Sequence, residues 1–418
     1  MAQIAMMHEE IVVRKRWIDE AHFQHALNYC MLLPGPEAQQ LATYIGWLMH
    51  GLRGGIAAGL LFILPSIAIL LGFSALYVHF GQVTWVAGFF MGLKPAVFAL
   101  VVLAAIRIGK KNLRHDIHVW TACAAVLLSF VHTPFVVIVL LAAAAGWRWR
   151  DYYVGLGPPL GSDPAWGLTP KGGLSLTSLT SSLGRAAKGA VSWLAERRVW
   201  RPWAIVLGLW VLPLLLSYGL SAYGDWFRRL GFFYTGTALF SFGGAYTVLP
   251  YVWQGAVQGH GWITATQMMD ALALGESTPG PLIMIVAFVG HLSTWNQLHI
   301  NDGWRDLWAV WGGLIAVWYT FLPSFLLVLV GSPWIEKARH FPNLSAPLTA
   351  VSCAVVGMIA LLALQALAHV VTGASLAVDG VMALMAVVVL FILIRRPHIP
   401  VWAVVLGSGT VGAIIYLF

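Results

Sequence analysis

The sequence has few charged residues. Asp, Glu, Lys and Arg make up only 10% of its 418 residues, whereas a soluble globular domain carries roughly 25%. Hydrophobic residues make up 59%, and the mean hydropathy is +0.79. So few charges cannot cover a surface that faces water on all sides. The composition therefore excludes an ordinary soluble domain and predicts an all-α polytopic membrane protein.

Cysteine and the common cofactor motifs are also scarce. Cys30, Cys123 and Cys353 lie in apolar segments without metal-ligand spacing, and we expect them to be buried free thiols. The fourteen histidines are scattered and form no His-Glu-x-x-His motif. The sequence has no phosphate-binding loop either. We therefore expect no metal, no cofactor, no catalytic residues and no nucleotide hydrolysis within this chain.

Long apolar runs dominate the rest of the sequence. Several approach the ~20 residues that a helix needs to cross a bilayer. The 21 Trp residues suit interfacial belts, and the net charge of +8 suits cytoplasmic loops and lipid headgroups rather than nucleic acid. The predicted spans are Ile56–Val78, Val86–Ile106, Ala204–Tyr223, Gly231–Val252, Leu307–Val330, Ala346–Val371 and Ser375–Ile394.

Helix-breaking motifs occur twice at matched spacing. Trp17-Ile18 is followed by Pro34-Gly35-Pro36, and Trp262-Ile263 is followed by Pro279-Gly280-Pro281. The number of residues between the Trp and the first Pro is the same in both cases. Such duplication predicts two homologous halves, residues 1–147 and 202–418, as inverted-topology repeats with broken or re-entrant helices. The second matched pair is Gly54-Gly55 with Leu64-Pro65-Ser66, and Gly312-Gly313 with Leu322-Pro323-Ser324.

The polar segments suggest which loops face the cytoplasm. Residues 148–201 are rich in Gly, Pro and Ser and carry a basic excess, so we expect a cytoplasmic linker. The loop Arg107–His118 is also basic. Between these two, Val119–Trp147 is interrupted by His132-Thr133-Pro134, which favours a hairpin of two helices that returns to the same side. Glu9–Glu20 is expected to be a charged surface helix or loop.

The repeat offset also bears on the start of the chain. Superposing the halves on their Trp-Ile pairs places the counterpart of Gly243-Gly244 immediately before Met1. The first half then lacks the span that opens the second half. We expect, as a hypothesis, that the natural protein starts upstream of Met1.

The paired breaks are the candidate substrate site. Proline and glycine end one helix and start another, and an exposed helix N-terminus offers N–H donors and partial positive charge to an anion. The alternatives are a simple kink, close helix packing for paired glycines, and snorkelling for Lys94. The candidate binding residues are Pro34, Gly35, Pro36, Lys94, Ser241, Gly243, Gly244, Ser277, Thr278, Pro279, Gly280 and Pro281.

Carboxylates lie next to both breaks. Glu37 follows the first, Glu276 precedes the second, and Asp270 lies on the same segment as Glu276. A carboxylate beside an anion repels it unless protonated, so Glu37 and Glu276 are candidates for proton coupling. The alternative for Glu37 is a carboxylate that the helix dipole favours at a helix N-terminus.

Together these residues resemble the chromate ion transporter family. The first half carries Met7-His8-Glu9-Glu10, Leu33-Pro34-Gly35-Pro36 and Gly92-Leu93-Lys94-Pro95-Ala96; the second carries Phe242-Gly243-Gly244 and Thr278-Pro279-Gly280-Pro281. The resemblance implies the long form of the family, with two halves of opposite topology in the bacterial inner membrane. It implies export of chromate, hence chromate resistance, with sulfate as the physiological analogue. The family's usual first Phe-Gly-Gly-Pro span is missing here.

Several alternatives stay open. A transporter of sulfate, molybdate or another tetrahedral oxyanion would use the same residues. A membrane-embedded enzyme would need a convergent catalytic set, and a regulatory membrane protein has no obvious use for duplicated breaks. The sequence leaves the energy source and the oligomeric state open, a homodimer included.

Overall fold

The computed structural model describes residues 2–154 and most of 208–417. Five of its helices are long and apolar enough to cross a membrane. They lie in α3 (Glu37–Phe80), α4 (Thr84–Asn112), α14 (Arg305–Ile335), α15 (Ser345–Val371) and α16 (Leu376–Arg395). The ranges outside the description are 1, 155–207, 214, 217–222, 242–244, 279, 299–302, 336–344, 372–375, 397–398 and 418.

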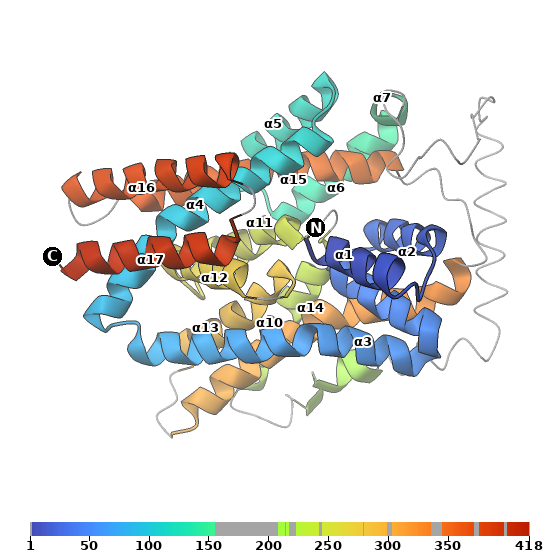
Figure 1. Ribbon diagram of the computed structural model, residues 1–418, viewed down its shortest axis with the longest axis horizontal. Coiled ribbons are helices and arrows are strands. Elements are labelled where there is room, and N and C mark those ends of the chain that lie inside the picture. The colour runs from blue at the N-terminus through green and yellow to red at the C-terminus, as the bar shows by residue number, and fades with distance from the viewer. Residues whose placement is uncertain are drawn as a thin grey trace.

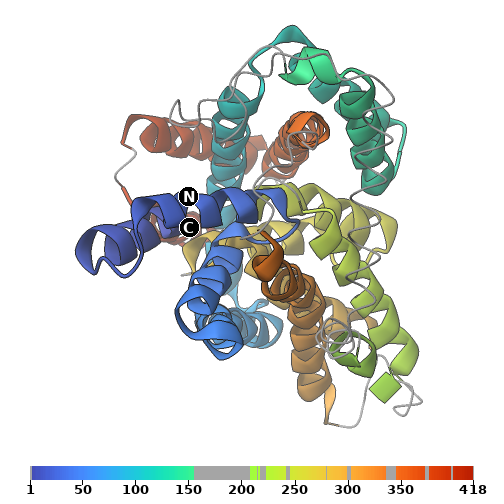
Figure 2. The ribbon, with the colours of Figure 1, turned by 90° about the vertical axis from the view of Figure 1, so that its right-hand side faces the viewer.

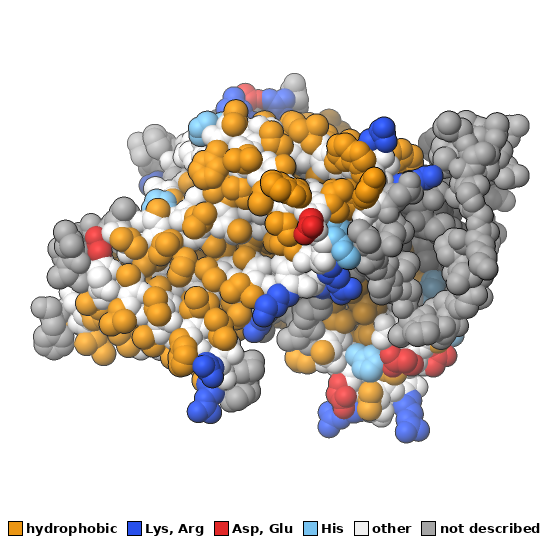
Figure 3. Space-filling model, turned by 90° about the horizontal axis from the view of Figure 1, so that it is seen from above, with side chains coloured by type: hydrophobic (Ala, Val, Ile, Leu, Met, Phe, Trp, Pro, Cys, Tyr) orange, Lys and Arg blue, Asp and Glu red, His pale blue; other side chains and the backbone are white. Residues whose placement is uncertain are grey.

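The described residues fold into helices and contain no strand. In Figure 1, α15, α16, α17 and much of α3 run along the long axis of the molecule. Hydrophobic side chains cover most of the described surface in Figure 3. Such a surface is stable in lipid, where each helix satisfies its own backbone hydrogen bonds. The chain is a multi-pass helical membrane protein, as its composition predicts.

Most predicted spans are confirmed, with three differences. Ala204–Tyr223 lies largely outside the described residues. The C-terminal helix α17 (Val401–Leu417) was not predicted, although it is apolar; it packs along α4. Gly231–Val252 is not one span, because α10 (Gly224–Leu239) ends before the short helices η3 (Ala245–Thr247) and α11 (Val248–Val252) begin.

The end of α10 has a local cause. The buried Ser241 hydroxyl donates to the carbonyl of Ala238 at 2.9 Å. A serine that bonds a nearby carbonyl competes with the helical hydrogen-bond pattern. Hydrophobicity alone does not reveal this competition, so the apolar run over this segment wrongly predicted a continuous helix.

The helical hairpin after the first basic loop is confirmed. α5 (Asp116–Phe130) and α6 (Phe135–Arg148) are separated by a turn in which His132 adopts a φ of 60°. The short helix α7 (Arg150–Val154) follows. Figure 2 shows α5 and α6 on either side of α15, against which both pack.

The two halves share an unusual local structure. Each half contains a π-helical turn, η1 (Glu9–Arg14) in the first and η4 (Trp253–Gly259) in the second. η1 lies in the segment Glu9–Glu20 that the sequence predicts to be a charged surface helix or loop. A positive φ follows at equivalent positions, 49° at Arg16 and 61° at Gly261. Two pairs of equivalent backbone hydrogen bonds close the turns. In the first pair, Lys15 N–H donates to Glu10 O and His260 N–H to Gly255 O, both at 2.9 Å. In the second pair, Trp17 N–H donates to Ile11 O at 2.9 Å and Trp262 N–H to Ala256 O at 2.8 Å.

A capped helix then leads to the break in each half. Asp19 accepts a hydrogen bond from the His22 N–H and starts α2 (Glu20–Leu32). The hydroxyl of Thr264 accepts from the Gln267 N–H and starts α12 (Ala265–Ser277). Side chains that satisfy the first N–H groups fix where a helix begins. The same stop and start signals therefore produce the same elements twice.

A second helical hairpin follows each break. α3 doubles back at His50 and Gly51, where Gly51 adopts φ 64° and ψ −154°. Its two arms touch at Gly46 and Gly54, since a Cβ on Gly54 would overlap the carbonyl of Gly46. In the second half α13 (Ile285–Gln297) and α14 form the corresponding pair, in contact at Gly290 and Gly312. Paired glycines here serve close backbone packing, which was the alternative to a role in binding.

The long second arm of α3 packs antiparallel to α14. Gly55 faces Leu329, Gly59 faces Phe325 and Gly313 faces Leu71. Along these contacts the residue numbers increase in α3 and decrease in α14, so the two helices run in opposite directions. Since Gly54-Gly55 and Gly312-Gly313 are equivalent in the repeat, two equivalent helices lie side by side in opposite directions.

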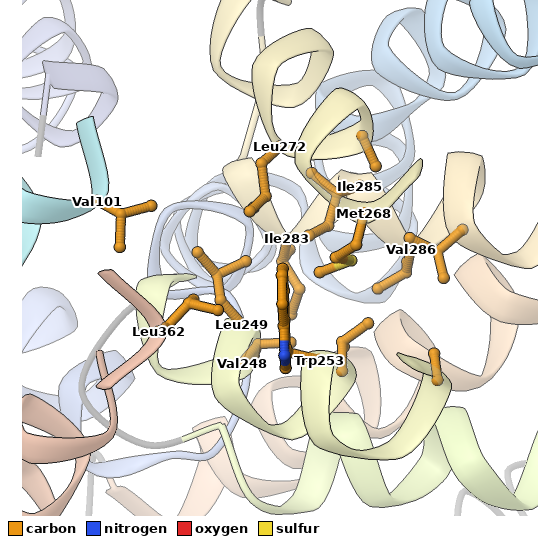
Figure 4. Packing of buried hydrophobic residues seen from close by; sticks show 14 of the residues in the cluster. Val101, Val248, Leu249, Trp253, Met268, Leu272, Ile283, Ile285, Val286 and Leu362 are labelled. Carbon is orange, nitrogen blue, oxygen red and sulfur yellow. The ribbon is translucent and has the colours of Figure 1, made fainter. Parts of the chain in front are cut away.

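The core surrounds the segments on either side of the second break. Met268 and Leu272 of α12 pack with Ile283, Ile285 and apolar residues from neighbouring elements (Figure 4). Cys30 and Cys353 are buried free thiols as expected. Cys123 is also free but exposed, because it lies on the outer face of the short helix α5.

Candidate anion site at the paired helix breaks

The first break joins α2 to α3. Gly35 has a φ of 126°, which favours glycine because it has no Cβ. Its N–H donates to the carbonyl of Ser241 at 2.9 Å, so the second half supplies one partner. Pro36 is the N-cap of α3, and Glu37 is its first residue. The predicted role of the triplet, to end one helix and start another, is confirmed.

The second break has the same geometry. α12 ends at Ser277, and Gly280 has a φ of 135°. Pro281 is the N-cap of the short 3-10 helix η5 (Leu282–Met284), which leads into α13. The matched φ angles show that the two triplets produce the same turn despite different flanking residues.

Each break faces a serine of the opposite half. A Cβ added to Gly35 would overlap the hydroxyl of Ser324, and one added to Gly280 would overlap that of Ser66. These serines follow Pro65 and Pro323, which lie inside α3 and α14. A proline inside a helix leaves a carbonyl without its usual N–H partner. The breaks therefore meet serine hydroxyls next to helix prolines rather than uniformly apolar walls.

Two buried glutamines enlarge the polar region at the first break. Gln40 donates through Nε2 to the carbonyl of Pro34 at 2.7 Å and to the Ser324 hydroxyl at 3.4 Å. Gln39 donates to the Thr43 hydroxyl at 2.9 Å. The Oε1 atoms of both amides are buried without a partner. Buried polar atoms without partners are uncommon and often mark functional positions.

The predicted hydroxyl groups lie at the breaks but bond to their own helices. Ser241 donates to Ala238 O, Ser277 to Ala273 O at 2.8 Å, and Thr278 to Gly275 O at 3.0 Å. They would have to rotate to donate to an anion. Gly243, Gly244 and Pro279 lie outside the described residues.

The two candidate coupling carboxylates have different surroundings. Glu276 accepts a hydrogen bond from the Tyr246 hydroxyl at 2.5 Å, one turn before the second break. Glu37 occupies the first turn of α3, where a carboxylate interacts favourably with the helix dipole. In the described part of the chain, neither forms an ion pair within 4.0 Å.

Lys94 lies in a different environment. It is half-buried on α4, where this helix packs on α12, and its charge acts on Asp270. Asp270 is fully buried and accepts a hydrogen bond from the Tyr77 hydroxyl at 2.8 Å. Lys94 and Asp270 thus lie on helices that pack against each other, which sequence spacing does not reveal. Among the described residues, no group of three or more His, Cys, Asp and Glu is arranged to hold a metal ion.

Sequence reasoning did not single out three residues that lie at the candidate site, Ser66, Ser324 and Tyr246. The matched Leu-Pro-Ser triplets contained the signal for Ser66 and Ser324, because repeated polar residues at repeated breaks suggest a shared surface. Nothing local marks Tyr246, whose role depends on a contact with α12.

Buried broken helices in a multi-pass protein define a class of membrane protein typical of transporters. The model of the chromate transporter family matches residues 1–147 and 228–413. The chain belongs to this family.

Several relatives are similar over most of the chain. A chromate transport protein of Pseudomonas aeruginosa is 31% identical, over 86% of this chain and 74% of its own length. One of Cupriavidus metallidurans is 26% identical, over 86% and 76%. An uncharacterised transporter of Methanocaldococcus jannaschii is 24% identical, over 81% and 72%. No solved structure matches the chain.

Proposed function

We propose that this protein is a secondary transporter that exports chromate from the bacterial cytoplasm and binds the oxyanion at the paired breaks. The main support is the reciprocal contact of Gly35 with Ser324 and of Gly280 with Ser66. Family membership and the two relatives named as chromate transport proteins support the choice of substrate. The proposed location is a bacterial inner membrane, which the apolar membrane-spanning helices suit.

The chemistry of the breaks suits a tetrahedral oxyanion. Each break ends in a new helix N-terminus, with N–H groups and partial positive charge. Ser66, Ser324 and the amide of Gln40 add neutral hydrogen-bonding groups from the opposite half or the adjacent helix. Neutral donors bind a dianion without holding it too tightly for release. Sulfate and molybdate, which share this shape and charge, are the alternative substrates.

The arrangement of the halves supports alternating access. The equivalent arms of α3 and α14 run antiparallel, as inverted-topology repeats require. Because each break contacts the opposite half, rocking one half against the other would open the site to one side and then the other. Glu276 and Glu37 are close enough in sequence to the breaks to couple proton binding to this motion.

Chromate binding to the purified full chain tests the proposal. We expect saturable binding of radiolabelled chromate that both Gly35→Ala and Gly280→Ala weaken at least tenfold, because each added methyl group overlaps a serine. Gly72→Ala is the matched control, since its Cβ would meet nothing within 4 Å. Unlabelled sulfate and molybdate serve as competitors. Unaltered affinity in folded Gly280→Ala would contradict the proposed site, and stronger displacement by sulfate than by chromate would reassign the substrate.

A further inference from the structure

A second polar site lies where α12 packs against α3 and α4. Asp270 is 1% exposed, and the Tyr77 hydroxyl donates to its Oδ2 at 2.8 Å. Its Oδ1 is buried without a partner. The aspartate comes from the second half and the tyrosine from the first. A carboxylate buried inside a membrane protein with one oxygen lacking a hydrogen bond is costly, so a residue in this situation is expected to serve a function.

The charged groups around Asp270 are few. Among the described residues, Tyr77 of α3 and Lys94 of α4 act on it. The charge of Lys94 also acts on His369 of α15. Lys94 forms no ion pair within 4.0 Å in the described part of the chain. Among the described residues, no ion pair therefore holds the carboxylate of Asp270 in its charged form, which leaves it able to gain or lose a proton.

A second pair of buried polar groups lies one turn away along α3. Ser74, one turn before Tyr77 on the same face of α3, shares a hydrogen bond of 2.8 Å with Nδ1 of His291. His291 is fully buried, and its Nε2 has no partner. His79 and Asp306 are close enough to act on it, and they bond to each other at 2.8 Å with half-exposed side chains.

We propose that Asp270 is a proton-binding site of the transport cycle, loaded through His291 from the end of the molecule marked by His79 and Asp306. The proton would pass from water to the imidazole of His291 and then to the carboxylate of Asp270, beside Ser74 and Tyr77. This inference rests on the proposed function, because it assigns the coupling ion of the same transporter. It adds a site distinct from Glu37 and Glu276.

The site is placed to sense both the substrate and the motion of the halves. Asp270 precedes Ser277, the last residue of α12, by about two turns or roughly 10 Å. Protonation removes a negative charge at that distance from the anion, so anion affinity should rise as the pH falls. Both Asp270–Tyr77 and Ser74–His291 join the two halves. Movement of one half against the other would therefore break the connection and isolate the proton.

The pH dependence of chromate binding tests this proposal. We expect the affinity of the full chain to rise several-fold from about pH 8 to about pH 6, and most of that rise to be lost in Asp270→Asn. Chromate itself takes up a proton in this pH range. The informative quantity is therefore the difference in the pH dependence of affinity between the unmodified protein and Asp270→Asn. Asp116→Asn, which alters an exposed carboxylate at the start of α5, is the matched control.

A second measurement separates the site from the proposed function. In vesicles, Asp270→Asn should retain exchange of internal for external chromate but lose accumulation driven by a pH gradient, and His291→Gln should slow that accumulation. An unchanged pH dependence and full gradient-driven transport in Asp270→Asn would overturn the proton site while leaving the transporter intact. Absence of chromate binding by the unmodified protein would instead contradict the proposed function.

Discussion

At the scale of the residue, the two central glycines explain why the breaks recur. Both adopt a φ that other residues rarely take, and both lie against a serine of the opposite half. Either constraint alone would favour glycine; together they leave no room for a side chain. Pro34-Gly35-Pro36 and its counterpart can therefore be identified from sequence, whereas the serines they face cannot, because that contact joins segments far apart in the chain.

The serines themselves can be tested. Ser66→Ala and Ser324→Ala remove a hydroxyl from each meeting point without adding bulk. We expect each to weaken chromate binding about ten- to a hundred-fold, which corresponds to one lost hydrogen bond to an ion. Ser352→Ala is the control, since that hydroxyl donates to the carbonyl of Leu348 within α15, away from the breaks in the sequence. Equal affinities in all three variants would remove the serines from the site.

The hydrogen bond between Tyr246 and Glu276 leads to a second prediction at this scale. Glu276→Gln keeps an oxygen that accepts from the tyrosine but cannot carry charge, so the fold should survive while gradient-driven transport falls. Tyr246→Phe removes the donor from a buried carboxyl and should lower the free energy of unfolding by about 1–3 kcal/mol. Thermal unfolding in detergent and vesicle transport measure the two effects. A Glu276→Gln variant with unchanged transport at every pH would exclude this carboxyl from coupling.

At the scale of the element, one glutamine holds the α5–α6 hairpin to the second half. The side chain of Gln254 accepts from the Phe135 N–H at 2.5 Å and donates to the Thr133 carbonyl at 2.9 Å. These backbone groups are left unpaired where the hairpin turns. Gln254 lies in the π-helical turn η4, so this unusual turn places a side chain at the tip of a distant hairpin.

Removal of that side chain should loosen the hairpin. In Gln254→Ala a part-buried N–H and carbonyl lose their partners, which we expect to lower the free energy of unfolding by about 1–3 kcal/mol. Gln258→Ala, four residues further on and exposed, should change stability by less than about 0.5 kcal/mol. Thermal unfolding of both variants checks the difference. Equal stabilities would show that the hairpin needs no such support.

Sequence reasoning predicted most elements because apolar length and Pro-Gly breaks are local signals. It recovered α4, α14, α15 and α16 and the hairpin at His132-Thr133-Pro134. It missed the fold-back at His50 and Gly51, because the positive φ of a single glycine leaves no mark in the hydropathy of the segment. The candidate site was predicted only in part, because its contacts join segments that lie far apart in the sequence. Tyr77 bonds Asp270, and Tyr246 bonds Glu276.

At the scale of the whole molecule, the account depends on two halves of opposite orientation. Lys15 and His260 occupy equivalent exposed positions at the end of the two π-helical turns. In a cysteine-free background, Lys15→Cys and His260→Cys should react with an impermeant thiol reagent from opposite sides of the membrane. Labelling of both from the same side would contradict inverted repeats, whatever the substrate.

Transport in inside-out membrane vesicles tests the central claim most directly. An exporter in these vesicles should accumulate radiolabelled chromate when the outer medium, which corresponds to the cytoplasm, is made more acidic than the lumen, because protonation favours anion binding. Gly280→Ala should abolish this accumulation, while Gly72→Ala preserves it. This result would join the substrate, the direction and the site in one measurement. No accumulation by the correctly inserted, unmodified protein, or full accumulation by Gly280→Ala, would contradict the account.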